Sequence, residues 1–194
     1  MSALLVFGVD YDGTIADTNV MIAKWIKMKV GIEVPPWKCD RTRCVPIIGL
    51  EIYEEMSDVV YEKEWTLKAP PVEGALEGLK KLKSLGRVYI VTARPKRRIK
   101  WAESWLRHHG VLDQIDGFIS AWNKSKRDLC REYSINILLD NDERHLTAIK
   151  DEDIVKVLIK NGGPKQLNVP RDLLYVTCWE EFLRIVEKIK SRDC

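Results

Sequence analysis

The stretch Val9-Asp10-Tyr11-Asp12-Gly13-Thr14 follows directly on an apolar run, residues 3–7. The run predicts a buried strand, so Asp10 is expected where that strand ends. In an open α/β sheet, ligands bind in the crevice beyond the carboxyl ends of the strands. Two carboxylates spaced i, i+2, with a glycine that lets the backbone turn sharply, suit a hard cation such as Mg²⁺ and a phosphate held against it.

The same pattern has two other interpretations. Asp-x-Asp-Gly also occurs in ordinary turns, and it can open a calcium-binding EF-hand loop. An EF-hand would need glycine at position 15 and glutamate at position 21, where this chain has Ile15 and Met21. The EF-hand is therefore excluded, and the choice between a turn and a ligand site depends on the ends of the later strands.

The composition is that of a globular protein. The 194 residues suffice for one domain with a sizeable insertion, or for one domain and a small second one. The net charge of +3 is too small to predict a nucleic-acid partner by itself. No apolar run approaches the length of a membrane span, and the first residues lack the basic segment of a secretory signal. We therefore expect a cytoplasmic protein with no membrane partner.

The five cysteines are scattered along the chain. Cys39 and Cys44 form the one close pair, but no second pair is present to complete a zinc site. Reduced thiols are the expectation for a cytoplasmic protein, and a local Cys39–Cys44 disulfide stays open as an alternative.

Apolar strand candidates alternate with helical segments over most of the chain. This alternation predicts βαβ units, and hence an α/β fold with a mostly parallel, Rossmann-like sheet flanked by helices. Thr177 and Glu180 are expected to form a capping box for a last helix. The expected strands are residues 4–9, 87–92, 117–121, 136–139, 154–159 and 174–176, with helices at 73–85, 96–109, 126–133 and 144–150.

Residues 15–70 interrupt the alternation. They contain two expected helices, at about residues 17–30 and 50–64, on either side of a stretch rich in Pro, Cys and Arg. We interpret residues 15–70 as a small helical cap, called the cap below. It would be inserted after the first strand into a core made of residues 1–14 and 71–194.

Three later motifs follow the aspartate pair. Val91-Thr92-Ala93-Arg94 ends the second strand with a hydroxyl, Lys126 stands near the start of a later helix, and Asp140-Asn141-Asp142 ends another strand. In this order the motifs resemble those of the haloacid dehalogenase superfamily of phosphotransferases, over nearly the whole chain. Thr-Ala-Arg-Pro and the position of the insertion look like the 5′(3′)-deoxyribonucleotidase group and its prokaryotic relatives.

The resemblance implies a role for each matching residue. Asp10 would attack phosphorus and form an aspartyl-phosphate, and Asp12 would protonate the leaving alkoxide and then deprotonate water. Lys126 is favoured over Lys124 because its spacing to the acidic strand end fits the superfamily. The substrate phosphate would be held by Thr92, Ala93, Arg94 and Lys126, with Lys126 supplying positive charge.

The resemblance also implies a Mg²⁺ ion held by the Asp10 side chain, the Asp12 backbone carbonyl and the acidic strand end. Most relatives have a carboxylate where this chain has Asn141. Asp140, Asn141 or, with a shift of the loop, Asp142 would complete the ligands. Fewer charges predict weaker Mg²⁺ binding than in an all-carboxylate site.

Together these inferences predict a Mg²⁺-dependent phosphomonoester hydrolase that acts on a small phosphate ester such as a nucleotide. One alternative is the same chemistry on a sugar phosphate or a polynucleotide end. Another is a non-catalytic protein that binds phosphate or nucleic acid on the same fold. The basic start of the helix at 96–109 opposes the helix dipole, which fits either a solvated helix end or a use in attracting anionic substrate.

Overall fold

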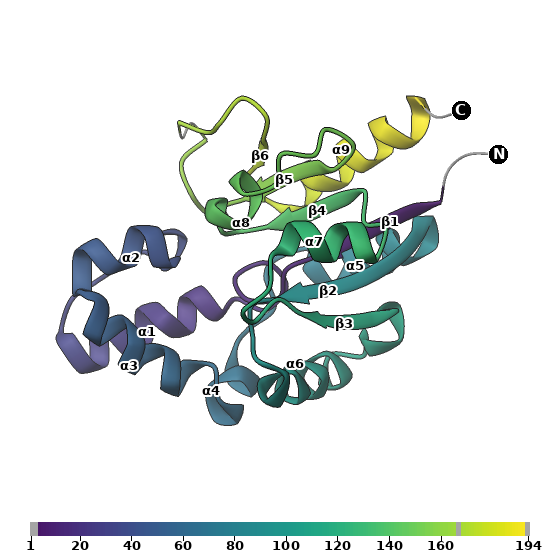
Figure 1. Cartoon of the computed structure of the whole chain (residues 1–194). Coiled ribbons are helices and arrows are strands. Elements are labelled where there is room, and N and C mark those ends of the chain that lie inside the picture. The colour runs from purple at the N-terminus through teal and green to yellow at the C-terminus, as the bar shows by residue number, and fades with distance from the viewer. Residues whose placement is uncertain (1–3, 166–167, 193–194) are drawn as a thin grey trace.

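A computed structural model describes residues 4–165 and 168–192 of the chain. Within these residues, six strands form one sheet in the order β3-β2-β1-β4-β5-β6, and every neighbouring pair is parallel (Figure 1). The predicted α/β fold with a Rossmann-like parallel sheet is confirmed. The strands are β1 (Leu5–Val9), β2 (Gly86–Thr92), β3 (Gly117–Ser120), β4 (Ile137–Asp140), β5 (Val155–Ile159) and β6 (Leu174–Val176).

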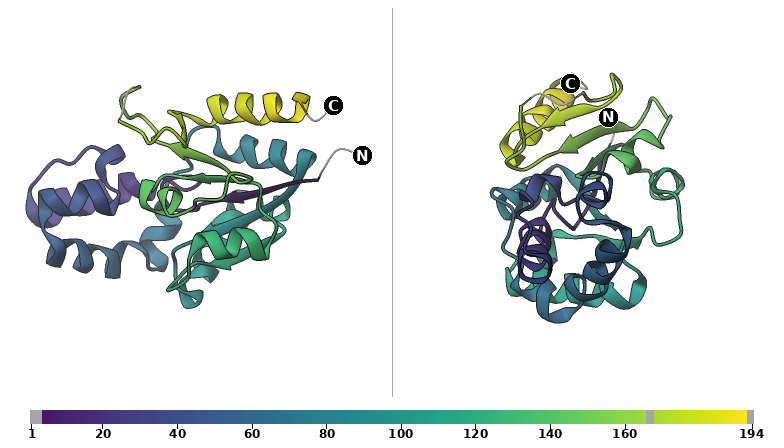
Figure 2. Two further views of the ribbon diagram at one scale, coloured as in Figure 1. Left: turned by 45° about the horizontal axis from the view of Figure 1, so that its top comes forward. Right: turned by 90° about the vertical axis from the view of Figure 1, so that its left-hand side faces the viewer.

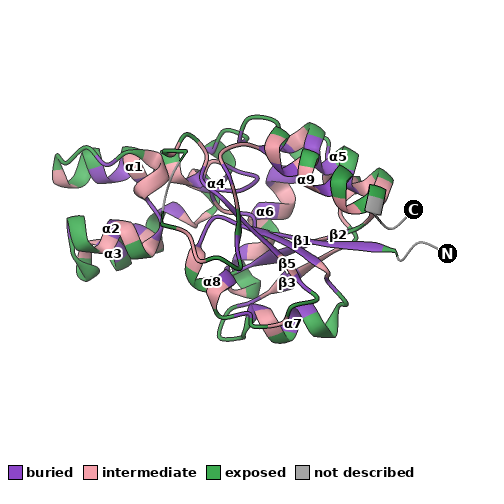
Figure 3. Cartoon of the chain, turned by 90° about the horizontal axis from the view of Figure 1, so that it is seen from above, coloured by how far each residue is buried: buried purple, intermediate pink, exposed green. Residues whose placement is uncertain are grey.

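Helices cover both faces of the sheet (Figure 3). On one face, α5, α6 and α9 pack Leu79, Trp105 and Trp179 into one hydrophobic cluster, and on the other face Leu129 of α7 and Leu146 of α8 lie in a second cluster. Burial on both faces explains why the strands read as continuous apolar runs. The helices are α1 (Thr18–Val30), α2 (Arg41–Ile48), α3 (Leu50–Val60), α4 (Lys63–Lys68), α5 (Ala75–Leu85), α6 (Lys96–His108), α7 (Lys126–Glu132), α8 (Glu143–Thr147) and α9 (Trp179–Arg192), with 3₁₀ turns at Pro36–Lys38 and Leu112–Gln114.

The strand order brings the motifs to one edge. β1 lies between β2 and β4, and Val9 is opposite Ile90 on one side and Leu139 on the other. The chain builds the sheet outward from β1 through β2 to β3 and then returns to place β4 on the other side of β1. Ligands bind in the crevice at such a reversal of strand order.

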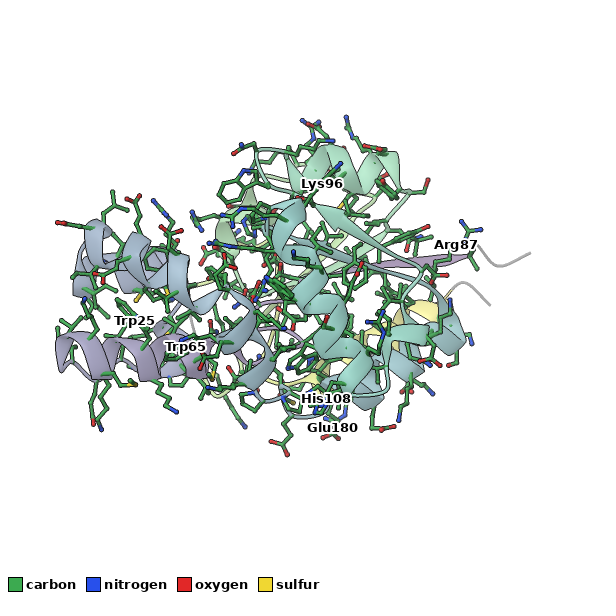
Figure 4. All side chains as sticks on the ribbon, turned by 90° about the horizontal axis from the view of Figure 1, so that it is seen from below. Trp25, Trp65, Arg87, Lys96, His108 and Glu180 are labelled. Atoms are coloured by element: carbon green, nitrogen blue, oxygen red, sulfur yellow. The ribbon has the colours of Figure 1, made fainter. Side chains whose placement is uncertain are left out.

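The cap lies beyond the carboxyl ends of the strands, at the opposite end of the molecule from the start of β1 (Figure 2). The two segments that join it to the core run side by side: the Asp17 N–H donates to the Pro70 carbonyl at 2.7 Å, and the Val72 N–H donates to the Ile15 carbonyl at 2.8 Å. Trp25 of α1 lies on the side that faces the other cap helices (Figure 4).

The cap contains more helix than its sequence pattern predicts. The two expected helices are present as α1 and α3, and α2 and α4 are additional. Helix α2 begins inside the stretch 34–44, which is rich in Pro, Cys and Arg and for which no helix was predicted. The cause is Asp40, whose side chain caps α2 by accepting a hydrogen bond from the Arg43 N–H at 3.1 Å.

The capping box predicted for the last helix is wrong by one residue. Helix α9 begins at Trp179, so Glu181, rather than Glu180, is its third residue. The Glu181 carboxylate accepts hydrogen bonds from the Thr177 N–H at 2.7 Å and from the Thr177 hydroxyl at 3.1 Å.

Cys39 and Cys44 are both buried free thiols, so the structure contains no disulfide between them. None of the helices in the described ranges is both long enough and apolar enough to cross a membrane.

Candidate active site

The candidate site begins where β1 and β4 end side by side. Lys126, the first residue of α7, donates hydrogen bonds from Nζ to Asp10 Oδ1 at 2.8 Å and to Asp140 Oδ2 at 2.6 Å. All three side chains are almost completely buried. Lys124, two residues earlier, is exposed. A buried cation therefore lies between two buried carboxylates at the edge of the sheet.

The electrostatics of this cluster follow from its burial. Burial raises the pKa of Asp10 to about 7, and the Asp140 and Asp12 carboxylates act in the same direction against the Lys126 ammonium. Burial also tends to raise the pKa of Asp140, but Lys126 and His145 outweigh it and hold that pKa below its usual range. The Lys126 ammonium therefore offsets only part of the effect of burial on Asp10.

Asp12 lies beside Asp10 and receives hydrogen bonds on both oxygens. Its Oδ1 accepts from the Thr18 hydroxyl at 2.7 Å and from Arg94 Nη2 at 2.7 Å, and its Oδ2 accepts from Arg94 Nε at 2.8 Å. Arg94 is thus paired with Asp12 through two parallel charge-assisted hydrogen bonds, an arrangement with strong directional preference.

Gly13 shapes the loop that carries both aspartates. Its φ is +75°, and its N–H donates to the Ala16 carbonyl at 2.8 Å. A β-carbon at this position would lie 2.1 Å from Asn141 Nδ2 and 2.7 Å from Asn19 Nδ2. Glycine therefore meets two needs here, because it tolerates the backbone conformation and leaves room for the Asn141 side chain.

The oxygen atoms near this turn are suitable ligands for a Mg²⁺ ion. Asp10, the Asp12 carbonyl and the Asn141 amide all offer oxygen, which Mg²⁺ prefers. A cation against Asp10 would also lower the pKa of this carboxyl, because positive charge favours its ionised form. In residues 4–165 and 168–192, no three or more His, Cys, Asp or Glu side chains are grouped to share one ion. Neutral oxygens and water would therefore complete the coordination.

A cleft of about 460 Å³ opens at this edge and is lined by both the core and the cap. The cap contributes Tyr53 and Tyr61, and the loop after β3 contributes Trp122, which is 54% exposed. Thr92 is fully buried, and its hydroxyl accepts a hydrogen bond from the Arg94 N–H at 3.2 Å. The predicted site residues that line the cleft are Asp10, Asp12, Ala93, Arg94, Asn141 and Asp142, whereas Thr92, Lys126 and Asp140 lie outside its lining.

The basic start of α6 is paired with acidic groups of the cap. Arg98 Nε donates to Glu62 Oε1 at 2.7 Å, Arg97 Nη1 donates to the same oxygen at 3.2 Å, and Arg98 Nη2 reaches Asp58 at 3.4 Å. Arg97 and Arg98 therefore join the core to the cap. The negative charge of Glu62 offsets the unfavourable position of two cations at a helix N-terminus.

Comparisons with known proteins bear on the fold. No family model matches the sequence. A Bacillus cereus protein described as "Putative nucleotidase" is 24% identical over 193 residues, which cover 94% of this chain and 98% of that protein. A haloacid dehalogenase-like hydrolase of Streptococcus pneumoniae has a TM-score of 0.64 at 14% identity, with 96% of this chain and 100% of that chain covered. A haloacid dehalogenase family hydrolase of Deinococcus radiodurans, solved with phosphate and sodium, has a TM-score of 0.60 at 9% identity, with 97% of each chain covered.

The chain has the fold of the haloacid dehalogenase-like hydrolases. The fold expected from the order of the motifs is therefore confirmed.

Two residues directly after β5 hold the loops at this edge of the sheet, and neither is among the predicted site residues. Lys160 Nζ donates to Asp40 Oδ2 at 2.8 Å and to the Asn141 carbonyl, and Asn161 Nδ2 donates to the Gly13 carbonyl at 2.8 Å. The sequence could have indicated both residues, because polar residues directly after any strand of a parallel sheet reach the same edge.

His145 also belongs to the site. Its Nδ1 lies 3.0 Å from Asp140 Oδ2. Burial tends to lower its pKa, but Asp140 outweighs this and raises it above the ordinary value. The imidazole thus helps Lys126 to keep Asp140 ionised.

Proposed function

We propose that this chain hydrolyses phosphate monoesters with Mg²⁺ as cofactor, through an aspartyl-phosphate on Asp10. The observation that carries the proposal is the Lys126 ammonium, which is buried between Asp10 and Asp140 directly behind the cleft that Asp10 and Asp12 line. A nucleophilic carboxylate, a cation for the transferring oxygens and a second carboxylate for proton transfer are the parts that phosphoryl transfer through a covalent intermediate needs.

In the first step, an Asp10 oxygen forms a bond to phosphorus while the bond from phosphorus to the leaving oxygen breaks. Asp12 gives that oxygen a proton. In the second step, a water molecule attacks phosphorus, Asp12 takes a proton from it, and the bond between Asp10 and phosphorus breaks to release inorganic phosphate. Lys126 contacts Asp10 and stabilises the negative charge that the phosphoryl oxygens carry in both transition states.

Mg²⁺ would be held by the Asp10 carboxylate, the Asp12 carbonyl and Asn141. When bound, the ion neutralises phosphate charge and keeps Asp10 ionised for attack. Lys160 donates to the Asn141 carbonyl and so fixes the loop that offers the amide. The substrate-binding role assigned to Thr92 would be indirect, because its buried hydroxyl contacts the Arg94 N–H.

A nucleotide is the substrate class we favour. Trp122 offers an exposed aromatic surface at the cleft, and a nucleobase can stack on such a surface. The name of the Bacillus cereus protein points the same way. Nucleoside monophosphates should therefore have a higher kcat/KM than sugar phosphates in a panel of phosphate esters. A preference for sugar phosphates or polynucleotide ends would replace this part of the proposal and keep the chemistry.

The test of the chemistry is phosphate release from p-nitrophenyl phosphate with and without Mg²⁺. Asp10→Asn removes the nucleophile with little change in volume, so turnover should fall by about 10³-fold or more. Chelation should abolish turnover, and added Mg²⁺ should restore it. The control is Asp128→Asn, because Asp128 is exposed on α7 outside the cleft lining and should leave turnover unchanged.

Full turnover by Asp10→Asn would reject the nucleophile assignment. Wild-type protein that binds phosphate or oligonucleotides with strong salt dependence but turns over no ester would favour the non-catalytic alternative.

A further inference from the structure

The Arg94 side chain is only 2% exposed, and each of its guanidinium nitrogens has a partner. Nε and Nη2 donate to the two oxygens of Asp12. Nη1 donates to the Thr66 hydroxyl at 2.9 Å and reaches the Tyr61 carbonyl at 3.4 Å. These contacts take four of the five N–H groups, and a substrate phosphate could take any of the four only by displacing Asp12 or the cap.

The contacts of Arg94 link two parts of the molecule. Arg94 follows β2 in the core, whereas Tyr61 and Thr66 belong to the cap. The ring centroids of Tyr11 and Tyr61 lie 5.0 and 5.3 Å from the guanidinium carbon, which allows cation–π attraction from both rings. The orientation of the guanidinium toward Asp12 is therefore supported by core and cap together.

The hydrogen bonds distinguish the two oxygens of Asp12. A carboxylate has about four acceptor positions, two on each oxygen. Oδ1 accepts from both Thr18 and Arg94, whereas Oδ2 accepts from Arg94 Nε alone. Oδ2 thus keeps a free acceptor position, and it is the oxygen of Asp12 that can hold a proton for transfer.

We propose that Arg94 is a positioning residue that directs Oδ2 of Asp12 toward the leaving group and makes this orientation depend on the docked cap. The inference rests on the phosphatase function proposed above. The Oδ2 proton passes to the leaving oxygen as its bond to phosphorus breaks. Oδ2 then takes a proton from water as the bond between Asp10 and phosphorus breaks. Arg94 touches neither reacting atom in either step.

The test compares two substrates of nearly equal size. Phenolate is a more basic leaving group than p-nitrophenolate and depends more on protonation, and kcat/KM reports only the steps up to formation of the aspartyl-phosphate. Arg94→Lys keeps the charge but loses the bidentate contact. We expect kcat/KM for phenyl phosphate to fall by about 10²-fold, the usual scale of general acid catalysis. The fall for p-nitrophenyl phosphate should be at least tenfold smaller.

Arg98→Lys is the matched control. Arg98 is also a buried arginine at the cleft that binds acidic groups of the cap, but its hydrogen bonds go to Glu62 and Asp58 and none goes to Asp12. Arg98→Lys should change kcat/KM for both esters by the same factor. In an Asp12→Asn background, Arg94→Lys should not change the ratio of the kcat/KM values for the two esters any further, because Asp12 and Arg94 act as a unit.

Thr66→Val tests the link to the cap and leaves Arg94 in place, so it also serves if Arg94→Lys fails to fold. It should reproduce the selective loss on phenyl phosphate at smaller size. The inference would be overturned if Arg94→Lys lowered kcat/KM for both esters equally, through a raised KM, and did so in the Asp12→Asn background as well. That result would mean that Arg94 binds the substrate phosphate. Absence of phosphate release by wild-type protein would overturn the proposed function itself, and this inference with it.

Discussion

At the scale of single residues, the shape of the loop that carries Asp10 and Asp12 depends on Gly13. Its left-handed φ and its contact with the Asn141 amide are separate demands, and no residue with a side chain satisfies both. Asp10 lies three residues before this glycine on the same loop, and the Asn141 side chain lies against the glycine, so its substitution should change the relative position of Asp10 and Asn141.

Gly13→Ala should therefore lower both stability and activity. The left-handed conformation costs about 1–2 kcal/mol for a residue with a β-carbon, and forcing the Asn141 and Asn19 side chains aside costs about 1–3 kcal/mol more. Urea unfolding should show a lowered free energy of unfolding, and p-nitrophenyl phosphate hydrolysis should need more Mg²⁺ for half-maximal rate.

Gly110→Ala is the control, because Gly110 has φ +68° but no atom within 4 Å of its β-carbon position. It should show the conformational cost alone, with activity unchanged. A Gly13→Ala protein with the stability, activity and Mg²⁺ response of Gly110→Ala would show that the contact with Asn141 has no role.

At the scale of elements, α2 of the cap is joined to β5 of the core by one buried ion pair. Asp40 caps α2 and accepts a hydrogen bond from Lys160, the residue after β5, and both side chains are 4% exposed or less. Because a charge left unpaired in such a place is costly, the pair makes the cap sensitive to the ionisation of Asp40.

Acid should weaken this connection. Burial tends to raise the pKa of Asp40, but Lys160 and Arg43 outweigh it and lower the pKa. A lowered folded-state pKa contributes stability that is present above the unfolded-state pKa and is lost as the pH falls through the folded-state pKa. The free energy of unfolding of wild-type protein minus that of Asp40→Asn should be about 1–3 kcal/mol at neutral pH and should shrink below about pH 4.

Asp17→Asn is the matched control, because Asp17 also caps a helix and asparagine caps about as well as aspartate. Burial raises the pKa of Asp17, so its ionisation destabilises the fold. Wild-type protein should therefore lose stability relative to Asp17→Asn as the pH rises. The same pH trend in both variants would contradict the assignment of the acid effect to the Asp40–Lys160 pair.

At the scale of the whole molecule, cap and core share one hydrophobic cluster. Buried residues of the cap, such as Trp25 and Met56, belong to the same cluster as Phe7 of β1 and Trp105 of α6. A continuous core favours cooperative unfolding of the whole chain. It also explains how contacts between cap and core can hold the Arg94 side chain in one orientation.

Met56→Ala should therefore destabilise the entire protein, although Met56 lies in the cap. Removal of a fully buried methionine side chain costs about 2–5 kcal/mol. Urea unfolding followed by circular dichroism and by tryptophan fluorescence should give coincident curves with a lower midpoint. Met28→Ala, at a position that is 71% exposed, should leave the midpoint unchanged. An early transition of the cap alone would contradict one shared core.

Much of the architecture could be predicted because it rests on local patterns. The apolar runs of β1 and β4 gave their strand positions to within a residue, and the alternation of strands with helices gave the parallel sheet. The cap was harder to predict, since α2 depends on the capping contact of Asp40 inside a stretch for which the sequence pattern predicted no helix. The capping contact of the last helix shows the same limit. Glu181, rather than the predicted Glu180, accepts the hydrogen bond from the Thr177 N–H, because a shift of one residue in the start of a helix changes which side chain reaches back.

The sequence by itself determined the α/β class, the strand that carries Asp10 and the order of the motifs, because these depend on periodicity and on residue types near one another in the chain. Only the tertiary structure decided the partners of those residues. Lys126 lies 116 positions from Asp10, Arg94 lies 82 from Asp12, and Lys160 lies 120 from Asp40. Such pairs are set by strand order and by the docking of the cap, and the same charged residues on a different packing would have met water instead.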